Sequence, residues 1–501
     1  MANREPHAVV FPFPTQGHIN PLSLLAKRLL NGGINVTFVH TARTFRMLQQ
    51  RNQIELSRKD SEDPGNYASC KGAKLRMEVL PDEVSTDDAS APVSPSVVLF
   101  ISSIPLLRVH LQCFLQRLLD EGRPASCIIS DTFLPWTQDV ANSFNIPRIE
   151  FWSSTAMVYS MGFSIPNLLR HGYLPVPSGT DLETTIDIVP GVGPCRHADF
   201  FYDLLHDSGA SPRFKFFQDA FSRGKESQRV LIHSMQHLED NVIQALREEG
   251  IPVDPIGPLL ESFVDGSASS THEHYTELNS VSLLDEDTSC LEWLNTHPKT
   301  SVIYVSFGSN VKIHVEEIQE LAFGLEDSQQ PFLLVIRPDL LDNKSLSDIL
   351  PDNFIERNRG RAWVSFWAPQ RAILLHPSVG GFLTHCGWNS ILESMWTGVP
   401  LIGCPRESEQ NTNLKCLLDW KCAISIDLKQ PKVILKRELV KTAISTLFNE
   451  PEGELVRSRM TELKTAARNT IEKGQSRFNL EKLIDDIKKM ASGDRPRFLP
   501  A

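Results

Sequence analysis

The amino-terminal part of the chain alternates short apolar runs with amphipathic helical patterns, as parallel α/β domains do. Residues 7–13 have the composition of a buried strand, and a helix with leucines on one face is predicted from Asn20 and Pro21 to the glycines at 32 and 33. Another apolar run, residues 125–130, ends at Asp131. This alternation predicts a doubly wound α/β domain.

The same alternation returns in the second half of the chain. A helix is predicted to open at Trp388, where apolar side chains begin to recur at helical spacing, and to end at Gly398 as its C-cap. A second α/β domain follows from this pattern. Its strands are predicted over residues 301–307, 363–366, 381–385 and 399–404.

A change in composition separates the two predicted domains. After the proline-rich segment 252–258, the chain is rich in Ser, Thr, Asp and Glu up to residue 289, which is typical of a linker. We predict domains over residues 1–258 and 291–475, a linker over 259–290 and a last helix over 476–490.

Composition and charge narrow the class of protein. The chain has 501 residues, 41 % of them hydrophobic and 22 % charged, as expected for an ordinary globular protein with two domains. A net charge of −11 disfavours nucleic acid and anionic membranes as partners. Nine cysteines without CxxC pairs predict reduced thiols in a cytoplasmic protein, and no segment is apolar for long enough to span a bilayer.

Residues 367–410 carry the groups needed to hold a nucleotide sugar. A strand, the turn at Gly387 and a helix N-terminus form an anion site, because the first amides of a helix lack internal partners. Trp367 offers a flat face for stacking, and Glu393 can accept hydrogen bonds from a vicinal diol. Side-chain donors and acceptors near the turn and the following strand are His385, Asn389, Ser390, Glu409 and Gln410. Each residue alone is more often a core or solvated group, so the prediction depends on the combination.

The first half supplies candidates for acid–base chemistry. His18 follows the first strand and Asp131 ends another, and side chains at the carboxyl ends of parallel strands face the crevice. A carboxylate can hold one imidazole nitrogen and leave the other free to take a proton. The turn Gly308-Ser309 after strand 301–307 can present amides and a hydroxyl to a phosphate or a nucleoside.

These segments resemble the plant family 1 UDP-glycosyltransferases. Residues 367–410 match the length and anchors of that family's nucleotide-sugar box, from WAPQ through HCGWNS to the final EQ. Residues 12–21 match its PFPxQGHxNP loop, and residues 305–309 match its VSFGS element. The box departs from the usual pattern at Glu407 and Ser408, where a carboxylate can add a sugar contact or face solvent.

The resemblance implies a role for each matched residue. His18, in the loop with Gly17, is the general base with Asp131 as its partner, and Ser153 lies near the transferred sugar. In the donor site, Trp367 stacks on uracil, Gln370 contacts the nucleoside and Glu393 binds the ribose. His385, Asn389 and Ser390 bind the phosphates, and Trp388, Glu409 and Gln410 bind the hexose. The predicted UDP-sugar site comprises Ser309, Trp367, Ala368, Gln370, His385, Trp388, Asn389, Ser390, Glu393, Glu409 and Gln410.

Aromatic side chains flank the His18 loop and the Asp131 strand end, and we predict that at least half of them are core. The others would line an apolar acceptor pocket, to which we assign Phe133 and Trp136 beside Gly17 and Ser153. The aromatic residues in question are Phe11, Phe13, Phe133, Trp136 and Trp152.

The resemblance also implies the GT-B fold, two facing Rossmann-like domains with the acceptor mainly on the first and UDP-sugar mainly on the second. The last helix would cross back onto the first domain. The expected activity is inverting transfer of glucose from UDP-glucose to a hydroxyl of a small lipophilic metabolite, phenolic or flavonoid first and terpenoid or steroid next. We expect no metal, no other cofactor and a monomer. A nucleotide-sugar epimerase on the same fold and a degenerate UDP-sugar-binding protein are the alternatives.

Overall fold

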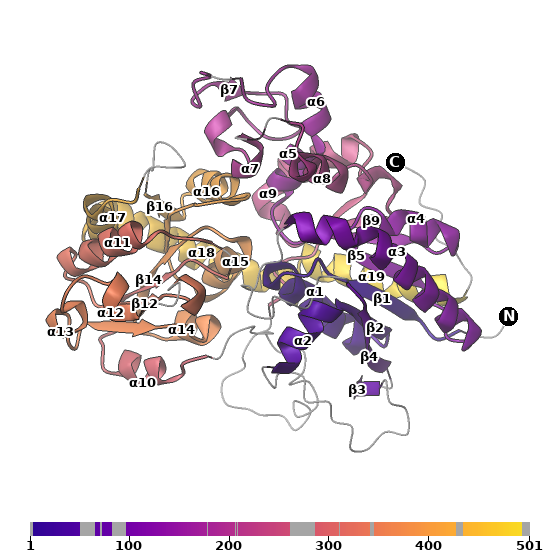
Figure 1. The fold of residues 1–501 in the computed structure, drawn as a ribbon, viewed down its shortest axis with the longest axis horizontal. Helices are drawn as coiled ribbons and strands as arrows, with labels where there is room; N and C mark the ends of the chain where they lie inside the picture. Colours follow the sequence, from indigo (N-terminus) through magenta and orange to yellow (C-terminus); the bar gives the residue numbers. More distant parts are fainter. Residues whose placement is uncertain are drawn as a thin grey trace.

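The computed structural model consists of two α/β lobes that lie beside each other (Figure 1). The residues it describes are 4–50, 66–70, 73–82, 97–177, 179–205, 207, 209–260, 286–309, 311–340, 345–426 and 434–492. Most of the predicted linker, residues 261–285, and the tail from residue 493 lie outside them.

In the first lobe, the described residues form an eight-stranded sheet in the order β10-β9-β6-β5-β1-β2-β4-β3, parallel except for the pair β3 and β4. Helices cover both of its faces, as two separate clusters of buried side chains show. The strands are β1 (His7–Phe11), β2 (Asn35–Thr41), β3 (Asn66–Cys70), β4 (Ala73–Leu80), β5 (Cys127–Asp131), β6 (Arg148–Trp152), β9 (Arg229–Ile232) and β10 (Val253–Pro255). The helices are α1 (Gln16–Asn31), α2 (Ala42–Gln50), α3 (Val97–Asp120), α4 (Thr137–Ser143), α5 (Ala156–Phe163), α6 (Ile165–Arg170), α7 (Tyr202–Leu205), α8 (Pro212–Ala220) and α9 (Gln236–Glu248).

In the second lobe, the described residues form a fully parallel six-stranded sheet in the order β13-β12-β11-β14-β15-β16. Its strands are β11 (Val302–Ser306), β12 (Phe332–Val335), β13 (Ala362–Ser365), β14 (Val379–Thr384), β15 (Leu401–Gly403) and β16 (Ala423–Ser425). The helices are α10 (Ser289–Asn295), α11 (Val315–Asp327), α12 (Leu346–Ile349), α13 (Phe354–Arg357), α14 (Gln370–Leu375), α15 (Trp388–Thr397), α16 (Gln410–Asp419), α17 (Arg437–Asn449) and α18 (Pro451–Glu472). As predicted, α15 ends at Gly398, whose φ of +84° is a conformation that favours glycine.

The last helix, α19 (Gln475–Ser492), leaves the second lobe and packs on the sheet of the first (Figure 1). Leu483 and Ile487 are fully buried in the core beside α1 and β1. Asp486 forms a buried ion pair with Arg229, and Ser476 donates to the carbonyl of Gly257 at 2.7 Å. The helix therefore joins the two lobes through the first lobe's core.

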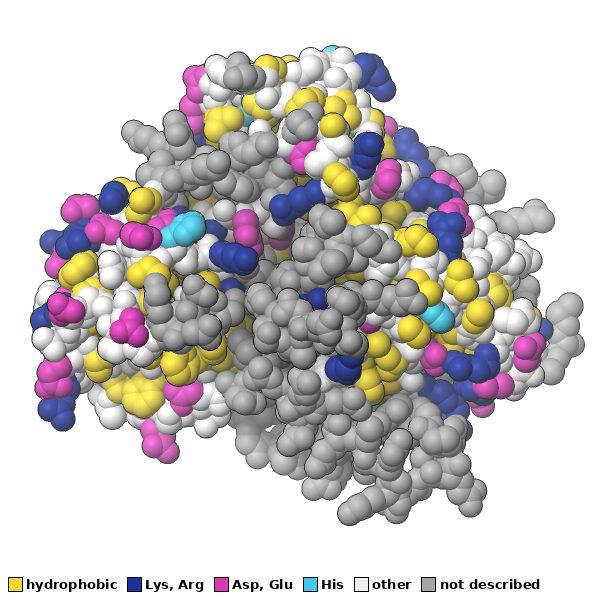
Figure 2. All heavy atoms as spheres, viewed as in Figure 1, with side chains coloured by type: hydrophobic (Ala, Val, Ile, Leu, Met, Phe, Trp, Pro, Cys, Tyr) yellow, Lys and Arg dark blue, Asp and Glu magenta, His cyan; other side chains and the backbone are white. Residues whose placement is uncertain are grey.

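Acidic and basic side chains are interspersed over both lobes on the face shown in Figure 2. That face carries no continuous basic patch among the residues described. Within the described ranges, no helix combines the length and the apolar composition needed to cross a bilayer.

Candidate active site

A cavity of about 750 Å³ lies in the cleft, at the carboxyl ends of the strands of both lobes. All the predicted site residues except Asp131 and Trp136 line it, so segments far apart in sequence meet in one place. The predicted residues that line it are Gly17, His18, Phe133, Ser153, Ser309, Trp367, Ala368, Gln370, His385, Trp388, Asn389, Ser390, Glu393, Glu409 and Gln410.

His18 and Asp131 form a hydrogen-bonded pair at the cavity wall. The Nδ1 atom of His18 lies 2.7 Å from Oδ2 of Asp131 and 3.2 Å from the hydroxyl of Ser153. Asp131 is fully buried, and its Oδ1 accepts from the backbone amide of Phe133 at 2.9 Å. Because Nδ1 and both carboxylate oxygens are occupied, the imidazole is held with Nε2 as its remaining polar atom.

The charges around His18 set its affinity for a proton. Burial acts to lower the pKa of His18, but the charge and hydrogen bond of Asp131, with a smaller effect of Glu409, outweigh it. The pKa therefore lies above its usual value of 6.5. The influence of Glu409 also means that the hexose end of the predicted donor site lies close enough to interact with His18 across the cleft.

The prediction that a loop carries His18 was wrong in detail. Helix α1 begins at Gln16, so His18 lies in its first turn and Pro21 lies inside the helix. We had placed Pro21 at the first helical position, where proline is most often found. Proline within a helix removes an amide donor, and a carbonyl one turn earlier is then left for another partner.

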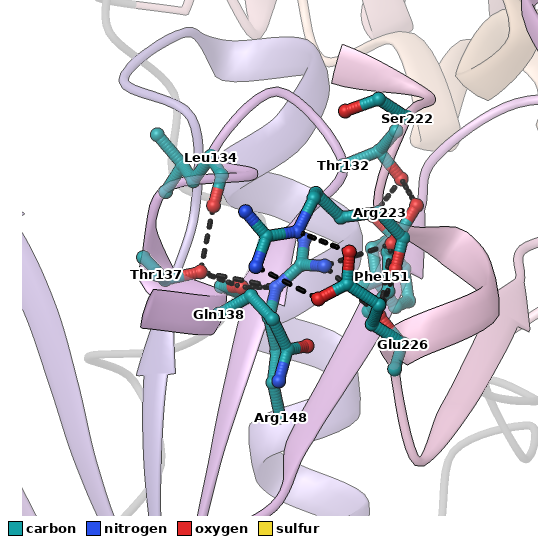
Figure 3. A network of polar contacts seen from close by, with 12 residues as sticks. Thr132, Leu134, Thr137, Gln138, Arg148, Phe151, Ser222, Arg223 and Glu226 are labelled. Atoms are coloured by element: carbon teal, nitrogen blue, oxygen red, sulfur yellow. Dashed lines mark hydrogen bonds and ion pairs between the residues drawn. The ribbon is translucent and has the colours of Figure 1, made fainter. Parts of the chain in front are cut away.

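A buried ion pair lies behind Asp131, and sequence reasoning did not find it. Arg148 and Glu150 are both fully buried on β6 and lie 2.8 Å apart. Arg148 also donates to Ser130 at 2.8 Å, to Thr137 at 3.0 Å and to the backbone carbonyl of Asp131 at 3.3 Å. Figure 3 shows Arg148 beside Thr137, with the Arg223–Glu226 ion pair in the same view. Buried charges require such partners, and here those partners fix the end of β5 that carries Asp131.

On the donor side, α14 and α15 bring together the residues predicted to hold a nucleoside. The amide nitrogen of Gln370 donates to Glu393 at 2.8 Å and to the hydroxyl of Ser390 at 3.0 Å. Tyr304, which was not predicted, donates to the amide oxygen of Gln370 at 3.2 Å. Burial raises the pKa of Glu393 against the effect of the Gln370 hydrogen bond. Trp367 lines the same end of the cavity and lies next to Ala368.

His385 lies against two glycines in the predicted phosphate region. A Cβ atom added at Gly308, where φ is +69°, would lie 2.5 Å from the imidazole, and one at Gly387 would collide with it. Burial, together with the charge of Arg337, lowers the pKa of His385 to about 4. His385 is therefore neutral at pH 7 and can offer a phosphate one N–H but no charge. Arg337 also donates to the carbonyl of Gly308 at 2.8 Å, which braces the turn that carries Ser309.

The predicted hexose end of the cavity is formed by the turn that leads into α16. The side-chain oxygen of Gln410 accepts from the amides of Arg406 at 2.9 Å and Glu407 at 3.1 Å, so only its NH₂ group remains for a ligand. Arg406 pairs with buried Glu317 and anchors the same turn. Glu407 lines the cavity together with Ser408 and Glu409.

Three side chains of the second lobe donate hydrogen bonds to backbone carbonyls of the first. The indole nitrogen of Trp388 donates to His233 at 2.7 Å, and the hydroxyl of Thr412 donates to Asp199 at 2.6 Å. The amide nitrogen of Asn389 donates to Gly17 at 2.8 Å. The indole N–H of Trp388 is thus already used, so a sugar contact at this residue must come from another atom.

The predicted acceptor side of the cavity carries many aromatic side chains. Phe133 lies with its ring 5.3 Å from His18 and 5.6 Å from the ring of Trp152. The prediction for Trp136 was wrong: it is buried against Phe11 in the core, because the turn after β5 directs it away from the cleft. Aromatic residues that sequence reasoning missed as lining residues are Phe201, Phe216, Phe217 and Phe221.

In the described part of the chain, no group of three or more His, Cys, Asp or Glu side chains is arranged to hold a metal ion. The donors that line the cavity include amides, hydroxyls, imidazoles, the N-terminus of α15 and the cationic side chains of Arg213, Lys312 and Arg371. Such groups can bind a diphosphate directly.

Comparison with known proteins confirms the family resemblance. A family model described as UDP-glucoronosyl and UDP-glucosyl transferase matches residues 275–460. The chain is 31% identical to the (R)-mandelonitrile beta-glucosyltransferase of Prunus dulcis, with 97% of this chain and 98% of that protein covered. It is 33% identical to the 7-deoxyloganetin glucosyltransferase of Catharanthus roseus, with 98% of both covered.

Solved structures show the same fold. A UDP-glucosyltransferase from Polygonum tinctorium capable of glucosylating indoxyl, in complex with 3,4-dichloroaniline, superposes with a TM-score of 0.77 and 29% identity. The match covers 98% of this chain and all of that one. Os79 from O. sativa in complex with UDP gives a TM-score of 0.75 at 25% identity, over 96% of this chain and all of that one.

Proposed function

Because the chain belongs to the UDP-glycosyltransferase family, we propose that it transfers glucose from UDP-glucose to a hydroxyl group of a small lipophilic acceptor, with inversion at the anomeric carbon. The observation that carries the proposal is the His18–Asp131 pair, joined at 2.7 Å in the wall of the cavity that the nucleotide-sugar residues also line. A general base and a leaving-group site then share one cavity, as glycosyl transfer requires.

In the proposed reaction, Nε2 of His18 takes the proton of the acceptor hydroxyl as its oxygen forms a bond to the anomeric carbon. The bond from that carbon to the UDP oxygen breaks, and an α-linked donor gives a β-glucoside. Asp131 stabilises the imidazolium that forms, since its carboxylate is 2.7 Å from Nδ1. The fully buried position of Asp131 strengthens this interaction.

The negative charge of the departing UDP is proposed to be held by α15 and its neighbours. The first amides of α15 lack helical partners, and His385, Ser390 and Ser309 add donors at the same end of the cavity. We propose that these groups make a metal unnecessary. The carboxylate of Glu393 and the amide of Gln370 are proposed to bind the ribose and the nucleoside.

The acceptor is proposed to be a flat or polycyclic molecule with a hydroxyl group. The first lobe lines the cavity with a group of aromatic side chains and a smaller set of polar ones, which are Thr15, Gln16, His18, Asn20, Ser153 and Arg213. Such a pocket holds its ligand mainly by burial and orients it with few polar contacts. Phenolics and flavonoids fit this description, and the relatives named for mandelonitrile and 7-deoxyloganetin support small aromatic and terpenoid acceptors as well.

One assay separates this proposal from its alternatives. The purified chain is incubated with UDP-glucose and a panel of phenolics, terpenoids and steroids, and UDP release, product mass and the chromatographic identity of the remaining UDP-sugar are measured. A transferase releases UDP only with a suitable acceptor, whereas an epimerase converts UDP-glucose without one and a degenerate binder leaves it intact. His18→Ala should lower turnover on an aliphatic alcohol about 10²- to 10⁴-fold, and an unchanged rate would contradict the assignment of the base.

A further inference from the structure

The backbone carbonyl of Gly17 lacks its usual amide donor within the helix, because the residue four positions later is Pro21. Within an α-helix, the amide of residue 21 would donate to the carbonyl of residue 17, but Pro21 lies inside α1 and has no amide hydrogen. Asn389 of the second lobe takes this place, with its side-chain nitrogen 2.8 Å from the Gly17 oxygen. A hydrogen bond from one lobe thus substitutes for a missing bond in the helix of the other.

This carbonyl belongs to the peptide group that immediately precedes His18. A donor fixed on it limits rotation of that peptide and so the direction in which the imidazole leaves the backbone. Asn389 itself is the second residue of α15, next to Trp388, whose indole crosses to His233 at 2.7 Å. The Asn389 contact holds the first turn of α15 against the first turn of α1, and the Trp388 contact holds it against the backbone that follows β9.

We propose that Asn389 is a positioning residue for the base, in addition to any contact with the donor. By holding the Gly17 carbonyl, it aligns His18 with the anomeric carbon of a sugar bound at the N-terminus of α15, and Pro21 keeps that carbonyl available. The inference depends on the proposed function in one respect, namely that His18 is the base. It predicts that loss of the amide slows the chemical step, because misplacing a reacting group by about 1 Å can cost roughly 10²-fold in rate.

A double-mutant cycle with His18 tests the inference. In the otherwise wild-type enzyme, Asn389→Ala should lower kcat on an aliphatic alcohol acceptor about 10- to 100-fold. In the His18→Ala background the same substitution should change kcat less than about threefold, since there is no base left to position. Equal fold losses in both backgrounds would overturn the inference and indicate a direct role on the donor.

Ser390→Ala is the matched control. Ser390 is the next residue of α15 and lines the same cavity, and its hydroxyl accepts a hydrogen bond from Gln370 within its own lobe. Its loss should weaken UDP binding and lower kcat/KM by the same factor in both backgrounds. If Ser390→Ala were as non-additive with His18→Ala as Asn389→Ala is, the effect would not be specific to the Gly17 contact, and the inference would fail.

A second variant covers the case in which Asn389→Ala does not fold. Asn389→Ser keeps a polar side chain at the start of α15 but is too short to reach Gly17, so it should show the same background dependence. Titration calorimetry with UDP measures any separate loss of donor contact: the fold loss in kcat should exceed the fold loss in UDP affinity for either variant, and equal losses of the two would overturn the inference. A fully active His18→Ala enzyme would instead refute the assignment of the base, so the two failures can be told apart.

Discussion

Replacing Asp131 with asparagine should change the rate and its pH dependence in a way that tests the geometry of the dyad. In the wild type, Oδ1 of Asp131 accepts from the amide of Phe133 at 2.9 Å, and Oδ2 faces Nδ1 of His18 at 2.7 Å. An asparagine that keeps the first bond must turn its NH₂ group toward His18. That group donates to Nδ1, so the ring hydrogen moves to Nε2 and the base is blocked.

The expected fall in kcat of Asp131→Asn can be estimated from these contacts. Losing a hydrogen bond to a charged group costs about 1.5–3 kcal/mol, which corresponds to about 10- to 150-fold in rate. The wrong tautomer adds to this, so kcat on an aliphatic alcohol should fall by about 10²- to 10⁴-fold in total.

The acid limb of the pH profile should move to lower pH in Asp131→Asn, even though the variant is slower than the wild type. The wild-type enzyme should lose kcat/KM as the pH falls through a value above 6.5, because Asp131 raises the pKa of His18 and the protonated ring cannot accept a proton. In Asp131→Asn the attraction of the carboxylate is gone while the burial that lowers the pKa remains. The acid limb should therefore lie at lower pH than in the wild type, although the enzyme is slower.

The assay is UDP release over pH 5 to 9 with an aliphatic alcohol acceptor, which cannot ionise unaided. Ser153→Ala serves as the control, since its hydroxyl is neutral and 3.2 Å from Nδ1 and should neither move the acid limb nor cost more than about tenfold. An acid limb that stays in place or moves to higher pH in Asp131→Asn would refute this account of the dyad.

Three further substitutions test other parts of the structure. Gln410→His should erode a preference for UDP-glucose over UDP-galactose by about 1–3 kcal/mol in competition kinetics, and a wild-type preference for UDP-galactose would show the hexose assignment to be wrong. Phe133→Ala should raise the KM for the acceptor. Trp136→Ala should instead lower the melting temperature and leave the acceptor KM unchanged; a raised KM in Trp136→Ala but not in Phe133→Ala would place Trp136 in the pocket. Asp486→Asn should lower the free energy of unfolding in urea by about 1–3 kcal/mol, because buried Arg229 loses one of its two carboxylates, and an unchanged midpoint would contradict the role of this ion pair.

The candidate donor site could be assembled from the sequence because it is nearly continuous. Most of its residues lie within positions 367–410, where strand, turn and helix follow one another and local patterns fix their order. Tyr304 was missed, since a tyrosine inside a buried strand has the same local pattern whether or not its hydroxyl reaches Gln370. The boundaries of the two domains were also set from composition alone and stay a prediction.

The dyad and the acceptor pocket were harder to predict, for a different physical reason. His18 and Asp131 are 113 positions apart; their places at two strand ends made them candidates, and the resemblance of the first loop assigned them as a pair. Phe216 and Phe217 come from α8, whose path over the cleft depends on packing between several helices rather than on its own sequence. Trp136 was misplaced because the direction of a turn after a strand cannot be read from the residues of that turn alone.

The contacts from Trp388, Asn389 and Thr412 to backbone carbonyls have a consequence for exchange between homologous enzymes. Every residue type has a backbone carbonyl. Side chains of the first lobe can therefore change without removing the carbonyl oxygens that accept these hydrogen bonds, provided that the backbone path is kept. A chimera that joins this donor lobe to the acceptor lobe of a relative should therefore dock without redesign of these three contacts. Acceptor range can be altered in this way while the position of the sugar is kept.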